Sequence, residues 1–231
     1  MGTAVLSSHR DAGGGLTLVA LDVDEATART YTTAGQYVEI RAEKGNGYFV
    51  LAGDEGARRF ELLVRNAGDA ADALVNGAIG TSFAISTALG EGFPIHAARA
   101  RPLVVAVVGS ALAAARPVLR RRLDDGDAAI TQLYIGVRAA AELPLAAEVE
   151  QWAERGIRVV LCLSRGELHH DEGTVPRAER VTGYVQLAIE RAIAAGKVPH
   201  GALVVAAGPE AMLAALRGLG GAGAVEVVTN V

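Results

Sequence analysis

RPLVVAVVGSALAAARPVLRRRL, residues 101–123, is the stretch that decides the fold. Its apolar run Leu103–Val108 lies between Pro102 and Gly109 and is typical of a strand buried in a parallel sheet. The chain then turns through Gly109 and Ser110 into an alanine-rich helical pattern. Free backbone N–H groups at such a helix start bind phosphate in open α/β sheets. The stretch therefore predicts a nucleotide pocket, with one glycine in a turn that usually has two or three.

Strand and helix patterns alternate throughout the chain after residue 100. Further strands are expected at Ile130–Ile135, Arg158–Leu163, Gly201–Ala206 and Val225–Val228. Helices are expected at Leu112–Leu123, Ala146–Arg155, Tyr184–Ala194 and Pro209–Leu216. Because this alternation is typical of a parallel sheet with helices on both faces, we expect a doubly wound α/β domain over residues 100–231.

Short alternating segments dominate the first 99 residues and are separated by glycine-rich turns. Strands are expected at Leu16–Leu21, Tyr37–Arg41, Tyr48–Leu51, Arg59–Val64 and Ser82–Ile85. One short helix is expected over Ala70–Val75, with Asp69 as its N-cap. Regularly spaced short strands with turn signals favour a small antiparallel β-barrel or sandwich over residues 1–99.

The composition argues against several classes of function. The 231 residues carry a net charge of −4, which gives no reason to expect nucleic-acid binding. No apolar run approaches the roughly 20 residues that span a bilayer. The first ten residues lack the basic and apolar regions of a secretory signal. These features favour a cytoplasmic protein without membrane insertion, and they leave its oligomeric state open.

Residues that bind metals or act as nucleophiles are few. Cys162 is the single cysteine, so the chain can form no internal disulfide or cysteine-ligated cluster, and we expect a buried thiol. His169–Glu172 is expected to be a solvated loop, because adjacent residues rarely converge on one ion. The basic residues Arg116 and Arg120–Arg122 are expected to decorate a helix C-terminus. No metal site is expected, and no catalytic residue is assigned.

Seven short motifs occur in the order found in ferredoxin–NADP+ reductases. They are Gly35–Val38 (GQYV), Leu51–Gly53 (LAG), Leu89–Ile95 (LGEGFPI), Val108–Ala113 (VGSALA), Tyr134–Arg138 (YIGVR), Gln151–Ala153 (QWA) with Leu163–Arg165 (LSR), and Ala207–Met212 (AGPEAM). Residues 16–231 therefore resemble the ferredoxin–NADP+ reductase superfamily. The resemblance implies an FAD-binding-type antiparallel β-barrel domain over residues 1–99 and an NAD(P)-binding-type α/β domain over residues 100–231.

The same resemblance implies a flavoprotein oxidoreductase. Such a protein passes reducing equivalents between NADH or NADPH, FAD and a separate electron-accepting protein or small acceptor. The FAD-binding residues that it implies are Tyr48, Phe49, Val50, Leu51, Ala52, Gly68 and Asp69. The nicotinamide-nucleotide-binding residues that it implies are Gly109, Ser110, Ala111, Arg138, Ser164, Arg165, Gly208 and Pro209.

Several positions depart from the pattern of that superfamily. Gly47 stands where an arginine usually pairs with the FAD diphosphate, and Val50 replaces a serine. Phe49 is expected to stack on the flavin, unless the register shifts by one residue and Tyr48 does so from the other face of the strand. Ala111 replaces a glycine that lets the diphosphate of the nicotinamide nucleotide approach the backbone.

Acidic residues also stand at the start of the short helix expected in the first domain. Asp69 is expected to cap this helix and to occupy the position that an FAD phosphate would take. A second function therefore stays open. In it the fold is kept, one or both cofactor sites have decayed, and the chain is a non-catalytic binding or regulatory subunit.

Overall fold

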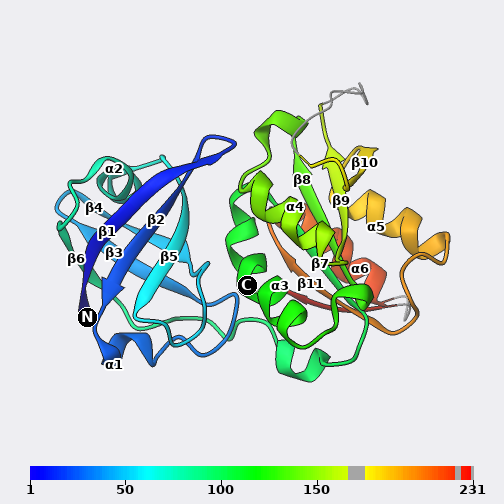
Figure 1. Cartoon of the computed structure of the whole chain (residues 1–231), viewed down its shortest axis with the longest axis horizontal. Helices are drawn as coiled ribbons and strands as arrows, with labels where there is room; N and C mark the ends of the chain where they lie inside the picture. The colour runs from blue at the N-terminus through cyan, green and yellow to red at the C-terminus, as the bar shows by residue number, and fades with distance from the viewer. Residues whose placement is uncertain (166–174, 222–224, 230–231) are drawn as a thin grey trace. The chain divides into compact units, whose positions relative to one another are not determined.

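The computed structural model describes residues 1–165, 175–221 and 225–229 (Figure 1). The expected loop His169–Glu172 lies outside the described residues. Contacts divide the chain into two compact units. One comprises Met1–Phe93 with Ser110–Val118, and the other comprises Pro94–Gly109 with Leu119–Val231. The first contains a six-stranded antiparallel sheet and the second a six-stranded parallel sheet, which confirms the expected two-domain fold class.

The first unit is a barrel whose strands follow the order β4-β3-β6-β1-β2-β5. The strands are β1 (Gly2–Gly13), β2 (Leu16–Val23), β3 (Tyr37–Ala42), β4 (Gly45–Val50), β5 (Arg59–Arg65) and β6 (Ser82–Ile85), with helices α1 (Glu25–Ala28) and α2 (Asp69–Asn76). A bridge between Leu51 and Leu62 joins the end of β4 to β5, and the Ala52 N–H donates to the Glu61 carbonyl at 2.7 Å. These contacts close the sheet around an apolar core.

The long strand β1 carries no clear signal in the sequence. Its alternation of apolar and polar residues begins at Ala4 and Leu6, which are fully buried. Register shifts against β2 then occur between Leu6 and Ser8 and between Asp11 and Gly13. Because each bulge moves the side-chain alternation by one residue, the strand loses the period of two that would predict it.

The second unit is a doubly wound sheet with the strand order β10-β9-β8-β7-β11-β12. Its strands are β7 (Leu103–Val108), β8 (Thr131–Val137), β9 (Arg158–Leu163), β10 (Glu179–Thr182), β11 (Ala202–Ala207) and β12 (Val225–Thr229). Its helices include α4 (Ala146–Glu154), α5 (Val185–Ala194) and α6 (Glu210–Gly221), and α3 (Leu112–Asp124) follows β7. Short 3₁₀ helices occupy Ile95–Ala98, Gly109–Ala111, Ala128–Ile130 and Ala140–Glu142. Figure 1 shows α4 on one side of this sheet and α5 and α6 on the other.

A glycine in β8 sets how closely α5 packs on this sheet. A Cβ atom added at Gly136 would lie 2.9 Å from Cγ2 of Val185 and 3.0 Å from Cγ2 of Val108. Val185 is buried in the first turn of α5. The glycine of the YIGVR motif therefore has a packing role, because it admits two valines that a methyl group would displace.

The expected surface role of the arginine cluster is wrong for two of its members. Arg116 and Arg122 are only 2% and 0% exposed. Arg122 donates from Nε to Oγ1 of Thr131 at 2.8 Å and pairs through Nη1 with Oδ2 of Asp127 at 2.9 Å. It also donates to the carbonyls of Ala98 and Arg101 at 2.6 and 2.8 Å. The guanidinium thus ties the segment before β7 to the end of α3.

Arg116 is held within the first unit. Its Nη1 atom donates to the Ala52 carbonyl at 3.1 Å and to Oε2 of Glu61 at 3.0 Å. Both buried arginines have the hydrogen-bonding partners that a desolvated charge requires.

Among the helices of the described residues, none is long and apolar enough to cross a membrane.

Candidate functional site

The two faces of β4 carry different side chains because successive residues of a strand point in opposite directions. Phe49 and Gly47 share one face, and a Cβ atom added at Gly47 would lie 2.9 Å from Cε2 and Cζ of Phe49. The Phe49 ring packs against the barrel core. Tyr48 points the other way and is 65% exposed. The structure therefore presents Tyr48, and not Phe49, as the accessible aromatic ring of this strand.

Tyr48 does not stand alone on the outer face. The ring of Tyr37 on β3 meets it edge-on, with centroids 5.9 Å apart and planes at 78°. Such an edge-to-face pair fixes the orientation of both rings. The Tyr48 ring is therefore held in place by Tyr37 and remains largely exposed.

Polar groups beside this pair already satisfy one another. Arg41 donates from Nε and Nη2 to the two carboxylate oxygens of Glu39 at 3.1 and 3.3 Å, and Asn46 donates to the same carboxylate at 2.8 Å. The hydrogen bonds from Arg41 and Asn46 hold the pKa of Glu39 below its ordinary value. The positive charge of Arg41 is thus matched by Glu39, which leaves less of it for an anionic ligand.

The backbone next to Tyr48 offers two directions of hydrogen bonding. The Leu51 N–H donates to the Gln36 carbonyl at 2.9 Å and so points toward β3. Because these groups alternate along a strand, the N–H groups of Tyr48 and Val50 point toward the other edge of β4. Leu51 and Ala52 are fully buried, and their N–H groups are both engaged, that of Leu51 by Gln36 beside β3 and that of Ala52 by Glu61 of β5. Of these predicted residues, Tyr48 and Val50 are the ones that lie on the outer face.

The start of α2 differs from the expectation in its capping. The N-cap is Gly68, with φ of +91°, and no side chain caps the helix, so the assignment of Asp69 as the cap is wrong. Asp69 is the first residue of the helix, and its carboxylate lies beside Gly45 of β4, where an added Cβ would be 3.5 Å from Oδ2. Asp72 accepts hydrogen bonds from Asn66 and Asn76 at 3.3 and 2.8 Å. The first-turn N–H groups therefore remain without a side-chain cap, although two carboxylates lie near them.

The residues predicted to bind the nicotinamide nucleotide follow the carboxyl ends of the parallel strands. Gly109, Arg138, Ser164 and Gly208 come directly after β7, β8, β9 and β11. The Ser164 N–H donates to the Val137 carbonyl at 3.0 Å, which carries the ladder beyond the strands. In doubly wound sheets ligands bind at this edge.

The glycines of this edge hold tight turns. Gly109 has φ of +55° and opens the 3₁₀ turn Gly109–Ala111, which also contains Ser110. A Cβ atom added at Gly208 would lie 2.8 Å from Cε of Met212. Pro209 follows, and its carbonyl accepts from the Met212 N–H at 2.9 Å as α6 begins. The two glycines thus bring backbone close to the edge where a nucleotide would lie.

The carboxyl edge of the sheet also carries side chains that could contact a nucleotide. Two are arginines that the sequence predicts, and the third is a tyrosine that it does not predict. Arg138 and Arg165 are exposed, and the Arg165 N–H donates to the Arg138 carbonyl at 3.0 Å, so two cationic residues come from neighbouring strand ends. Tyr184, which lies outside the superfamily motifs, precedes α5 and is 60% exposed. The Gly183 N–H donates to the Leu163 carbonyl at 2.9 Å, which places Tyr184 next to the end of β9. Its signal was an aromatic residue between a glycine and a helical pattern.

The described part of the chain contains no group of three or more His, Cys, Asp and Glu residues placed to hold a metal ion. Cys162 is fully buried in β9, and burial raises the pKa of its thiol to about 12. A thiol with such a pKa is protonated at neutral pH and is a poor nucleophile. Cys162 is therefore a core residue of the sheet.

Comparisons with known proteins place these two units among solved structures. No family model matches the chain, and no curated protein matches it. The crystal structure of the Amycolatopsis cytochrome P450 reductase GcoB is similar at 25% identity and a TM-score of 0.77, covering 98% of this chain and 68% of that one. A ferredoxin reductase in carbazole 1,9a-dioxygenase matches at 16% identity and a TM-score of 0.76, with coverage of 99% and 68%. A Neisseria gonorrhoeae ferredoxin NADP+ reductase with bound FAD and NADP matches at 14% identity and a TM-score of 0.73, with coverage of 99% and 98%.

Proposed function

We propose that this chain, which has the two-domain fold of the ferredoxin–NADP+ reductase superfamily, is a flavin-dependent oxidoreductase. It would take reducing equivalents from NADH or NADPH and pass them through FAD to a separate acceptor. The observation that carries the proposal is the exposed ring of Tyr48, set against Tyr37 at the outer edge of a barrel of this fold.

The residues of the barrel fit the flavin end of FAD. The Tyr48 ring offers a stacking surface for the isoalloxazine, and the N–H groups of Tyr48 and Val50 point toward the edge of β4 that lies opposite β3, where they would donate to ring heteroatoms. When bound, the flavin supplies hydride acceptance and one- or two-electron transfer. This chain would bind the flavin ring against Tyr48 and leave one edge of the ring accessible.

The start of α2 fits the diphosphate less fully. Its uncapped N–H groups at residues 69–71 suit an anion. Asp69 and Asp72 oppose one, and the side chain two residues before Tyr48 on the same face is Asn46 rather than a cation. We therefore expect FAD to bind more weakly than it would with an arginine at that position.

The carboxyl edge of the parallel sheet would bind the nicotinamide nucleotide. Gly109, which opens the turn Gly109–Ala111, and Pro209, which precedes α6, follow the carboxyl ends of β7 and β11. Helix starts at this edge of a doubly wound sheet favour the binding of phosphate. Ser164 and Arg165 offer donors to a ribose or its phosphate, and the exposed ring of Tyr184 beside them offers a surface for base stacking. These groups bind and orient the nucleotide, and they do not take part in bond making.

The proposal also covers the electron acceptor and the cellular location of the protein. The names of the first two structures, a cytochrome P450 reductase and a ferredoxin reductase of a dioxygenase, favour an acceptor that is a separate redox protein. A small acceptor is the other option that the chemistry permits. We propose a cytoplasmic location, consistent with the free thiol of Cys162.

Spectroscopy of the purified protein tests the proposal. We expect absorbance in the flavin bands, either as isolated or after incubation with FAD and removal of the excess. Anaerobic addition of NADH or NADPH should then bleach these bands. A protein that stays colourless after incubation with FAD contradicts the proposal, and a yellow protein that neither nucleotide bleaches restricts it to flavin binding.

One set of observations favours the second candidate, a non-catalytic binding or regulatory subunit. Arg41 is already paired with Glu39, Asp69 and Asp72 lie at the start of α2, and Ala111 carries a methyl group in the nicotinamide loop. The Ala111→Gly variant distinguishes a hindered site from a lost one. Tighter binding of NADH or NADPH by this variant supports the reductase, and no detectable binding by either protein supports the subunit.

A further inference from the structure

A pocket of about 230 Å³ lies within the second unit, away from the carboxyl edge of its sheet. Arg158 and Glu179, which line it, are the first residues of β9 and β10, and Lys197 follows the end of α5. These positions belong to the amino ends of the strands. Gly109, Arg138, Ser164 and Gly208 follow the opposite, carboxyl ends. The pocket is therefore separate from the proposed nucleotide site.

The inner wall of the pocket is apolar and lined by small side chains. Ala188 and Ala192 on α5 face Val160 and Val181 on β9 and β10. Alanine at these positions leaves space between the helix and the sheet that leucine would fill. The volume is below the roughly 300–1,000 Å³ of pockets for drug-sized ligands. The space therefore suits a small, compact apolar group.

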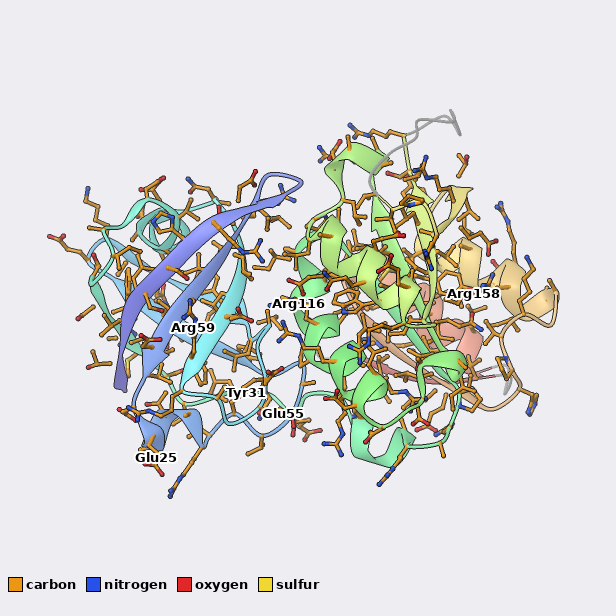
Figure 2. All side chains as sticks on the ribbon, in the orientation of Figure 1. Glu25, Tyr31, Glu55, Arg59, Arg116 and Arg158 are labelled. Atoms are coloured by element: carbon orange, nitrogen blue, oxygen red, sulfur yellow. The ribbon has the colours of Figure 1, made fainter. Side chains whose placement is uncertain are left out.

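The polar part of the wall is an ordered network around Arg158, the residue labelled in Figure 2 on β9. Arg158 donates to Oε2 of Glu179 at 2.6 Å, to Oε1 of Gln132 at 3.0 Å and to the Tyr134 hydroxyl at 3.3 Å. The guanidinium also lies over the Tyr134 ring, 5.9 Å from its centroid. The hydrogen bond from Arg158 holds the pKa of Glu179 below its ordinary value, so Glu179 is ionised and cancels the charge of Arg158.

Two further cations line the same pocket. Lys197 lies 3.8 Å from Oε1 of Glu179, a carboxylate already engaged by Arg158. Arg191 on α5 has no ion-pair partner among the residues that the structure describes. The end of α5 contributes a partial negative charge of about one half, which leaves an excess of roughly +1.5 at the pocket. The wall is thus cationic at its rim and apolar inside.

We infer that this pocket binds a small organic carboxylate with a compact apolar body. The carboxylate would lie between Arg191 and Lys197, and the apolar body would lie against Ala188, Ala192 and Val160. An arginine guanidinium matches a carboxylate in a bidentate geometry, which makes it the natural anchor of such a ligand. The inference does not depend on the proposed reductase function, because it uses none of the cofactor residues.

Benzoate and its uncharged isostere benzamide are the probes for a test on the full-length protein. In ¹H–¹⁵N spectra, we expect benzoate to shift the amide signals of residues 188–197 in a saturable way and to leave those of residues 109, 164 and 208 unchanged. Benzamide should cause no such shifts. Absence of a saturable shift at tens of millimolar benzoate overturns the inference, and so do equal shifts with both probes.

Variants then separate the pocket from general charge effects. Arg191→Gln should weaken benzoate binding at least tenfold, and Ala188→Leu should abolish it by filling the pocket. Arg217→Gln on α6 makes the same change in charge outside the pocket and should leave binding unchanged. Equal weakening by Arg191→Gln and Arg217→Gln contradicts a specific site. All three side chains are at least partly exposed, and thermal unfolding verifies that each variant is folded.

Discussion

The ring of Phe49 covers Gly47, two residues before it on the same face of β4, so closely that a Cβ atom at Gly47 would lie 2.9 Å from the ring carbons. This contact turns Phe49 into the barrel core and leaves Tyr48 exposed on the other face. The contact also explains why residue 47 has no side chain. An arginine there would not reach the outer face, where Tyr48 lies.

The first prediction contrasts the two aromatic residues of β4. Tyr48→Ala should weaken FAD binding roughly 5- to 150-fold, the range of about 1–3 kcal/mol for the loss of a stacked ring. It should leave the free energy of unfolding nearly unchanged because the ring is exposed. Phe49→Ala should instead lower the free energy of unfolding by about 2 kcal/mol, because it empties space above Gly47 but removes a ring that is only partly buried. Flavin fluorescence titration and urea unfolding measure the two effects, and the reverse pattern would contradict the assignment of Tyr48.

The second prediction concerns the missing cation. Asn46 lies on the face of Tyr48 and two residues before it, which is the spacing of arginine and tyrosine in the superfamily's flavin strand. Asn46→Arg should therefore tighten FAD binding about tenfold, as expected for one charge-assisted hydrogen bond. Gly47→Arg places the same charge on the Phe49 face and should destabilise the barrel without tightening FAD binding. Equal gains in affinity from both variants would show that the register of β4 is different.

The resemblance of seven short motifs to a superfamily predicts the fold, but it does not determine which face of β4 points outward. The superfamily's flavin strand aligns Phe49 with its tyrosine, and a shift of one residue aligns Tyr48 instead. The sequence cannot distinguish these two alignments, because Tyr48 and Phe49 are adjacent and place an aromatic ring on each face of β4. The decision comes from packing, since Gly47 and Ala70 leave room for only the Phe49 ring on the inner face.

Buried charge was the other feature that sequence could not predict. Four arginines in the segment 116–122 read as a solvated helix end, and composition offers no way to select Arg116 and Arg122 among them. Their burial depends on acceptors distant in the chain, such as Glu61 for Arg116. The strand β10 was missed for a related reason, because it is a four-residue edge strand whose pattern, ERVT, is half polar.

The third prediction tests the buried Arg122. Arg122→Ala should lower the free energy of unfolding by about 3–5 kcal/mol, because it removes the cation paired with Asp127 and the donor to the buried Ala98 carbonyl and the partly buried Arg101 carbonyl. The adjacent Arg121 is 48% exposed at its side chain and pairs with Asp125 one turn away. Arg121→Ala should therefore cost only about 0.3–0.5 kcal/mol. Urea unfolding curves measure both, and similar losses would show that Arg122 is not a structural anchor.

The fourth prediction concerns pH and the thiol of Cys162. Burial raises the pKa of this thiol to about 12, above its value in the unfolded chain, so the folded state keeps a proton that the unfolded state releases. Stability from this group is complete below about pH 8.5 and falls as the pH rises toward 12. Cys162→Ala should make the free energy of unfolding less sensitive to pH in this window. Parallel slopes for the two proteins between pH 9 and pH 11 would contradict the buried, protonated thiol.

The fifth prediction uses one substitution at two glycines and expects opposite signs. Gly136→Ala places a methyl group 2.9 Å from Val185 and 3.0 Å from Val108, so it should lower the free energy of unfolding by about 1–3 kcal/mol. Gly218 lies in α6 with no atom within 4 Å of an added Cβ. Gly218→Ala should raise the free energy of unfolding by about 0.5–1 kcal/mol, because alanine favours a helix interior. Since the chemical change is identical, losses at both sites would mean that helix propensity does not control α6, and gains at both would mean that α5 can move away from β8.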